Sequence, residues 1–156
     1  LNTVYSTVDA VERHVADADL VIGSVLVPGA AAPKVVTEEM IKSMRPGSVV
    51  VDIAIDQGGY FETSRPTSHD DPIYTKHGVV HYCVTNMPGA VAQTSTFALN
   101  NATLPYTLKL ADLGWKKALL SDPGFLEGLN VHEGKVTYEA VAEAVGMDYT
   151  PREDVL

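Results

Sequence analysis

The sequence of 156 residues contains a single cysteine, Cys83. No internal disulfide can form, which favours a reducing compartment. A lone cysteine in a predicted strand is typically a small buried hydrophobic residue and not a nucleophile. The histidines have no spacing typical of a metal site and no cluster of cysteines beside them, so no metal ligand is expected among them: His14, His69, His77, His81 and His132.

Basic residues and long apolar runs are also scarce. Eleven Lys and Arg oppose 20 Asp and Glu, which gives a net charge of -9. This balance argues against a nucleic-acid partner or an anionic membrane surface, because both require clustered cations. No apolar run approaches the roughly 18 residues that a membrane span needs, and no signal-peptide pattern starts at Leu1.

Several catalytic motifs are missing. There is no Gly-x-Ser-x-Gly elbow and no phosphate-binding glycine-rich loop with a lysine. No strand, turn and helix with Gly-x-Gly-x-x-Gly precedes residue 2, although the sequence starts inside predicted regular structure and without Met. We therefore expect the chain to be a fragment of a longer protein.

The part that is present alternates between strand and helix patterns. Apolar residues make up 46% of the chain, enough for a packed core. Hydrophobic spacing and turn residues predict, in order, a strand at Thr3–Tyr5, a helix over 7–18 with Ser6 as its N-cap, a strand over 20–25, a helix from Thr37 to Met44 and a strand over 48–55. This order predicts a doubly wound parallel sheet.

The second half of the sequence predicts fewer strands. Residues 57–78 look irregular, with Pro66 and Pro72, and a strand follows over 79–84. A long helix is expected from Gln93 to Leu113, which Pro105 should kink or divide. Shorter helices are expected over 123–129 and 136–145, and the tail from Asp148 should be loose.

The strand over 50–55 runs directly into Asp56, Gly58 and Gly59. Its apolar composition suits a central strand that is covered on both faces, and ligands bind beyond the carboxyl ends of such strands. We expect Asp56 to be partly buried and either to act on a ligand or to cap the next turn. Asp52 is interpreted as a structural hydrogen-bond partner. The two glycines would allow a flat ligand or another backbone to come close.

Three loops that follow parallel strands should meet at one edge of the sheet. They are Gly23–Leu26, Ile53–Asp56 and Val84–Met87, and together they could hold one face of a dinucleotide. Any α/β domain has such loops, so the arrangement alone also fits a fold without this function. Arg65 could bind a pyrophosphate or be a solvated surface group, and Met87 could pack on a flat ring or fill the core.

Four motifs resemble alanine dehydrogenases: Val25-Leu26-Val27-Pro28-Gly29-Ala30-x-Ala32-Pro33-Lys34, Met44-Arg45-Pro46-Gly47-Ser48, Asp52-Ile53-Ala54-Ile55-Asp56-Gln57-Gly58-Gly59 and Thr85-Asn86-Met87-Pro88-Gly89-Ala90-Val91. The resemblance runs along the whole chain. NAD-binding subunits of proton-translocating transhydrogenases share the Pro-Gly-x-x-Ala-Pro-Lys and Met-x-Pro-Gly-Ser segments. They usually carry Ala-Glu-x-Gly-Gly in place of Ile55–Gly59, and they lack the Asn86-Met87-Pro88 pattern. The dehydrogenase is therefore favoured.

The resemblance implies an NAD-dependent enzyme that reversibly converts L-alanine to pyruvate and ammonium, typically a cytoplasmic homohexamer. It implies that Asp56 is a catalytic carboxylate near the reacting centre. It also implies a set of residues that contact NAD: Ser6, Val25, Leu26, Ile53, Ala54, Ile55, Asp56, Arg65, Val84, Thr85, Asn86 and Met87.

The resemblance also implies what the chain lacks. The family's catalytic His, its substrate-binding Arg and Lys and its Gly-x-Gly-x-x-Gly turn belong to an N-terminal half. Residues 1–90 would then be the C-terminal part of a Rossmann-like NAD-binding domain, and residues 91–156 would be helices that return to the substrate domain. Alone, the chain should bind NAD weakly and catalyse nothing. A non-catalytic nucleotide-binding or oligomerisation module is the remaining alternative.

Overall fold

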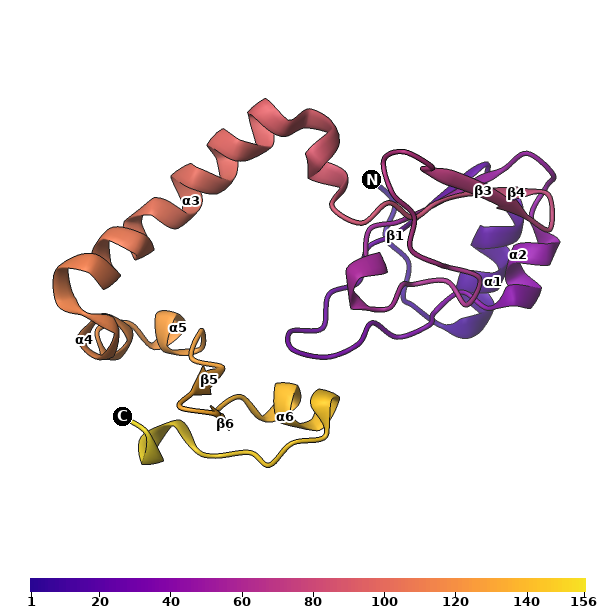
Figure 1. The fold of residues 1–156 in the computed structure, drawn as a ribbon. Helices are drawn as coiled ribbons and strands as arrows, with labels where there is room; N and C mark the ends of the chain where they lie inside the picture. Colours follow the sequence, from indigo (N-terminus) through magenta and orange to yellow (C-terminus); the bar gives the residue numbers. More distant parts are fainter. The chain divides into compact units, whose positions relative to one another are not determined.

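The computed structural model describes all residues from Leu1 to Leu156. The chain divides into two compact units, Leu1–Val27 with Ala31–Ala90 and Pro28–Ala30 with Val91–Leu156. In Figure 1 the first unit runs from indigo to magenta and contains the main sheet, and the second, apart from Pro28–Ala30, runs from rose to yellow. None of the helices combines the length and the hydropathy that a membrane span requires.

The first unit is an α/β layer structure, as the alternating pattern predicts. Its sheet has the order β1-β2-β4-β3, and β1, β2 and β4 are parallel, whereas β3 is antiparallel to β4. Gly23 pairs with Asp52 and Val51 pairs with Tyr82, so the three parallel strands end at the same edge. The elements are α1 (Val8–Asp17), β1 (Leu20–Gly23), α2 (Glu38–Ser43), β2 (Val49–Asp52), η1 (Ile55–Gln57), β3 (Ile73–Lys76), β4 (Val79–Tyr82) and η2 (Met87–Val91).

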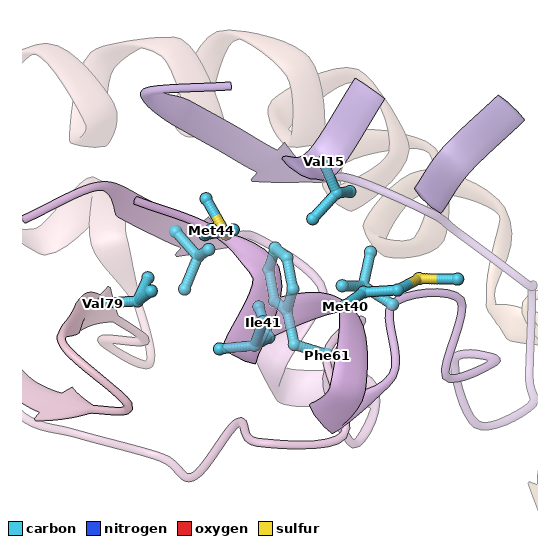
Figure 2. Packing of buried hydrophobic residues seen from close by; sticks show 8 residues of the cluster. Val15, Met40, Ile41, Met44, Phe61 and Val79 are labelled. Carbon is cyan, nitrogen blue, oxygen red and sulfur yellow. The ribbon is translucent and has the colours of Figure 1, made fainter. Parts of the chain in front are cut away.

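One face of this sheet carries the core. The ring of Phe61 has no exposed surface and lies in the middle of a hydrophobic cluster (Figure 2). α2 contributes most to this cluster, and its start is fixed because the Thr37 hydroxyl accepts a hydrogen bond from the N–H of Met40 at 3.3 Å. The cluster consists of Val15, Val36, Met40, Ile41, Met44, Val50, Phe61 and Val79.

The other face of the sheet is less well covered. Val49 and Val51 of β2 are only half-buried, and Leu20 and Ile22 of β1 are 54% and 55% exposed. The strand over 50–55 was expected to be covered on both faces, and at Val51 this face of β2 is covered only in part. Alternate residues of a strand point to opposite faces, and only the Val50 face receives α1 and α2.

The start of the chain also differs from the prediction. Residues 1–7 form no strand, because no neighbouring strand supplies the hydrogen bonds that a strand requires. The N-cap of α1 is Thr7 and not Ser6, since the Thr7 hydroxyl accepts from the N–H of Ala10, three residues on, at 3.2 Å.

The segment predicted to be irregular contains β3. β3 and β4 form a hairpin whose two turn residues, His77 and Gly78, both have positive φ, 54° and 78°. Such a turn matches the twist of the strands that it joins. β2 is shorter than predicted, because residues 53–54 turn and η1 begins at Ile55.

The second unit consists mainly of helices. α3 is continuous through Pro105, so the proline does not divide it, and Gly114 ends it as expected. None of its residues is buried, and only Lys109 and Asp112 are charged. The elements are α3 (Ala92–Leu113), α4 (Trp115–Leu120), α5 (Pro123–Leu126), β5 (Val131–His132), β6 (Lys135–Val136), α6 (Glu139–Val145) and η3 (Arg152–Asp154).

Two predictions for the end of the chain are wrong. The last helix begins at Glu139 and not at Val136, because Val136 pairs with Val131 in a short hairpin. The tail is not loose, since both terminal nitrogens of Arg152 donate to the Glu127 carboxylate at 2.8 Å. Gly146 ends α6 in the left-handed conformation, as expected.

Candidate functional site at the carboxyl edge of the parallel strands

The loops after β1 and β2 are joined by hydrogen bonds. The N–H of Ile53 donates to the Gly23 carbonyl at 2.8 Å, and the Gln57 amide donates to the Val27 carbonyl at 3.3 Å. The N–H of Ala32 donates to the Gln57 carbonyl at 2.7 Å. These two loops therefore form one continuous edge of the sheet.

Asp56 lies in η1 at this edge, four residues beyond the end of β2. Its side chain is exposed, so the expectation of partial burial is wrong. The strand ends earlier than its apolar run does, and the turn at Ile53 and Ala54 carries Asp56 out to solvent. The N-cap position of η1 is Ala54, which makes no side-chain hydrogen bond, and Asp56 lies inside the turn. Ile53 beside it is 52% exposed, whereas Ala54 and Ile55 are buried.

The loop after β4 comes from the next parallel strand at the same edge. Val84 is fully buried, Thr85 and Met87 are half-buried, and Asn86 is exposed with a φ of 58°. A ring nitrogen of His69 lies 3.0 Å from the Asn86 carbonyl oxygen. The backbone here is fixed in a conformation that non-glycine residues adopt rarely.

A second segment runs beside this loop. The N–H of Thr67 donates to the Cys83 carbonyl at 3.0 Å, and the N–H of Thr85 donates to the Thr67 carbonyl at 3.1 Å. Arg65 lies at the start of this segment. Its guanidinium carbon is 4.0 Å from the centre of the Tyr74 ring, and the backbone N–H of Arg65 donates to the Tyr74 hydroxyl at 2.9 Å. The hairpin strand β3, which the sequence did not predict, thus supports Arg65.

The remaining predicted residues lie elsewhere on the first unit. Ser6 lines a hollow of about 360 Å³ beside β1, together with Tyr5, His14 and Ile22. Val25 is half-buried and Leu26 is 74% exposed in the loop after β1. The structure brings the loops after the three parallel strands to one edge, and Ser6 lies along the flank of β1.

Below this edge, Asp52 is fully buried, and its predicted role as a hydrogen-bond partner is confirmed. Its Oδ2 accepts from the N–H of Tyr60 at 2.7 Å, from the N–H of Phe61 at 3.4 Å and from the Ser64 hydroxyl. Its Oδ1 is buried and has no hydrogen-bond partner. An unsatisfied buried acceptor costs about 1–3 kcal/mol, which the other contacts of the loop must offset.

The two glycines after Asp56 have different surroundings. Both have positive φ, 96° at Gly58 and 89° at Gly59. A Cβ at Gly58 would meet nothing within 4 Å, whereas a Cβ at Gly59 would lie 2.8 Å from Oδ2 of Asp52 and 2.9 Å from Cβ of Ser64. The close neighbours of Gly59 are therefore the side chains of Asp52, Ser64 and Lys34, and Gly58 is the one that faces open space.

Buried polar groups link the segment around Thr63 to β3 and β4. His81 is fully buried and its Nε2 lies 2.7 Å from the Thr63 hydroxyl. Burial lowers the pKa of His81, which favours the neutral ring. Burial also raises the pKa of the Cys83 thiol, so Cys83 is a buried and unreactive residue, as predicted. His81 was not among the predicted site residues, and only its place in an alternating strand pattern indicated burial.

The family of the chain follows from a comparison of this sequence with family models. The model described as alanine dehydrogenase/PNT, C-terminal domain, matches residues 1–139. The chain belongs to this family. The sheet and edge described above are thus those of an alanine dehydrogenase/PNT C-terminal domain, and the family and its Rossmann-type fold imply a nucleotide cofactor.

Relatives within the family agree. The chain is 64% identical over 149 residues to an alanine dehydrogenase of Halomonas elongata, covering 96% of this chain and 40% of the relative. It is 57% identical over 157 residues to an alanine dehydrogenase of Methanococcus maripaludis, covering 100% of this chain and 42% of the relative. The chain spans about two fifths of the length of these curated relatives.

Solved structures show the same fold. An L-alanine dehydrogenase has a TM-score of 0.76 and 52% identity, and the match covers 91% of this chain and 39% of the other. The transhydrogenase from Sinorhizobium meliloti has a TM-score of 0.66 and 29% identity, and that match covers 83% of this chain and 35% of the other.

Proposed function

We propose that these residues belong to an NAD-dependent L-alanine dehydrogenase, which reversibly converts L-alanine, NAD and water to pyruvate, ammonium and NADH. The observation that carries the proposal is the identity of 57–64% to proteins named alanine dehydrogenase over 96% or more of this chain. The substrate-binding and acid–base groups of the reaction would lie in the part of the protein that these residues do not include.

The edge of the sheet would hold one side of the cofactor. The exposed Asp56, the open space at Gly58 and the three loops that end at one edge fit a nucleotide that lies across the carboxyl ends of β1, β2 and β4. When bound, NAD accepts a hydride from Cα of alanine. The residues proposed to contact it are Ser6, Val25, Leu26, Ile53, Ala54, Ile55, Asp56, Arg65, Val84, Thr85, Asn86 and Met87.

Asp56 would be the catalytic carboxylate of this part of the protein. Its side chain is exposed at this edge of the sheet, where a nucleotide lying across the strand ends would reach it. Through its charge and hydrogen bonds, Asp56 would orient the water that attacks the substrate. Alternatively, it would orient the amine of the carbinolamine that this attack forms. Arg65, whose guanidinium is exposed above Tyr74, would bind the pyrophosphate.

We further propose a division of labour along the chain. Residues 1–90 would complete the nucleotide-binding domain, and residues 91–156 would return to the substrate domain. The separation of two compact units near residue 90 supports this division. A cytoplasmic homo-oligomer, a hexamer by resemblance, would be the assembled form.

A hydride exchange between two nicotinamides is the second candidate function. It is favoured by the family model, which also covers PNT, and by the structural match to a transhydrogenase. The lower identity of that match, 29% against 52%, supports the dehydrogenase.

The test is to express the encoding gene in full and to follow NADH absorbance with L-alanine and NAD at alkaline pH. An increase that depends on alanine is expected. If the folded protein binds NAD but produces no NADH, the dehydrogenase proposal is wrong. Reduction of an NAD analogue by NADH would then indicate hydride exchange, and its absence would indicate a binding module.

A further inference from the structure

The loop that carries Asp56 is closed at its base by a buried acid. Asp52, the last residue of β2, accepts a hydrogen bond at Oδ2 from the N–H of Tyr60 at 2.7 Å. Asp56 lies midway between these two residues in the sequence. The contact therefore closes residues 52–60 into a ring, with Asp56 at its tip. The N–H of Gly59 also donates to the Ala54 carbonyl at 3.0 Å within this ring.

Two further side chains fasten the same ring. The Ser64 hydroxyl donates to Oδ2 of Asp52, and the Lys34 ammonium donates to the Gly58 carbonyl and, at 3.3 Å, to the Phe61 carbonyl. A Cβ placed on Gly59 would lie 2.8 Å from Oδ2 of Asp52 and 3.2 Å from Nζ of Lys34. A side chain at position 59 would thus press against both the Asp52 carboxylate and the Lys34 ammonium, and only glycine fits between them.

The buried carboxylate of Asp52 therefore holds the loop that carries the exposed Asp56. Asp52 has no exposed surface, and three donors converge on its single oxygen Oδ2. The bond from Tyr60, at 2.7 Å, has the length of a charge-assisted hydrogen bond, which is stronger than a neutral one. A neutral amide at this position would weaken all three bonds at once and would also place an NH₂ group where no acceptor is available.

We propose that Asp52 is a positioning residue for the reaction, an inference that rests on the proposed dehydrogenase function. Asp52 ends β2, but its side chain is buried below the edge of the sheet and would touch neither cofactor nor substrate. It holds the 52–60 ring so that the Asp56 carboxylate stays at its working position, where a displacement of about 1 Å is enough to cost up to roughly 100-fold in rate.

The test is a double-mutant cycle in the full-length protein between Asp52→Asn and Asp56→Asn, with Asp70→Asn, an exposed loop acid, as the matched control. We expect Asp52→Asn to lower kcat by about 10- to 100-fold and to change KM for NAD by less than about 3-fold. If Asp52 acts only through Asp56, the double variant should be no slower than Asp56→Asn alone. Effects that multiply, or an unchanged kcat in Asp52→Asn, overturn the proposal.

A milder variant covers the case in which Asp52→Asn does not fold. Ser64→Ala removes one of the three donors and should lower kcat by roughly 3- to 10-fold, with the same failure to multiply with Asp56→Asn. Circular dichroism establishes that each variant is folded before its rate is measured. If a folded Ser64→Ala protein has the same kcat as the wild type, the proposal that Asp52 positions Asp56 is wrong.

A separate measurement distinguishes this proposal from the function on which it rests. Hydrogen exchange at the N–H groups of Tyr60 and Phe61 should become faster in Asp52→Asn, because both donate to the carboxylate. If the wild type shows no alanine-dependent NADH formation, the proposed function is wrong, whereas unchanged exchange at these two amides shows that Asp52 does not hold the ring.

Discussion

Gly58 and Gly59 offer a comparison in which the same substitution should have different costs. Both residues have positive φ, so an alanine at either position pays the backbone strain of an L-residue there, about 1–2 kcal/mol. Part of this strain, about 0.4–1 kcal/mol, is offset because alanine restricts the unfolded chain. Gly58→Ala should therefore lower the free energy of unfolding by about 1 kcal/mol, since its Cβ meets nothing within 4 Å.

Gly59→Ala has an additional steric cost. Its Cβ would lie 2.8 Å from Oδ2 of Asp52 and 2.9 Å from Cβ of Ser64, closer than real Cβ contacts allow. Asp52 is fully buried and holds three hydrogen bonds, so it cannot move aside without breaking them. Overpacking of this kind costs about 1–3 kcal/mol, which gives a total of about 2–4 kcal/mol for Gly59→Ala.

The assay is equilibrium urea unfolding of the two variants and the wild type, followed by far-ultraviolet circular dichroism. The decisive quantity is the difference between the two variants, because backbone strain and unfolded-state effects largely cancel in it. We expect Gly59→Ala to be less stable than Gly58→Ala by about 1–3 kcal/mol. Equal stabilities, to within about 0.5 kcal/mol, would refute the close packing of Gly59 against Asp52 and Ser64.

Three other predictions concern single side chains. Asp56→Asn in the full-length protein should lose most of its kcat, and an unchanged kcat in steady-state assays would show that the carboxylate is not catalytic. His77 and then Lys76 lower the pKa of Glu38 to about 2. The small stabilisation from this exposed carboxylate is therefore present above its ordinary pKa of 4.5 and lost as the pH falls through about 2. A carboxyl NMR titration of the wild type and His77→Gln checks this, and a wild-type midpoint near 4.5 contradicts it. Cys83 should resist thiol reagents until urea unfolds the protein, because the folded sheet buries it and raises its pKa; rapid labelling of the native protein would oppose this.

Helix boundaries with a strong local signal were predictable from the sequence. Thr37 before Glu38 and Glu39 predicted α2, and the structure gives Thr37 as its N-cap. At the start of α1, two adjacent hydroxyl residues, Ser6 and Thr7, are both suitable caps. The backbone geometry makes Thr7 the N-cap, which the sequence alone does not show. Residues 3–5 have strand-forming side chains, but a strand depends on a partner that local sequence does not reveal.

The site was predictable in its topology and less so in its detail. Parallel strands had to end at one edge, so the three loops could be grouped from the sequence alone. The exposure of Asp56 was missed because apolar residues continue beyond the end of β2 through a turn, where Ala54 and Ile55 are buried without being in a strand. The hairpin that supports Arg65 was missed because nearby prolines suggested a loop, although His77-Gly78 between strand-forming residues was a usable turn signal.

The sparse charge of α3 has a consequence for how the purified chain behaves in solution. The chain as a whole carries a net charge of -9, which should keep molecules apart through mutual repulsion. α3, however, holds only Lys109 and Asp112 along 22 residues and exposes large apolar side chains such as Phe97 and Leu99. Salt screens the repulsion between molecules but does not weaken apolar attraction, so the colloidal stability of the chain should be highest in dilute buffer.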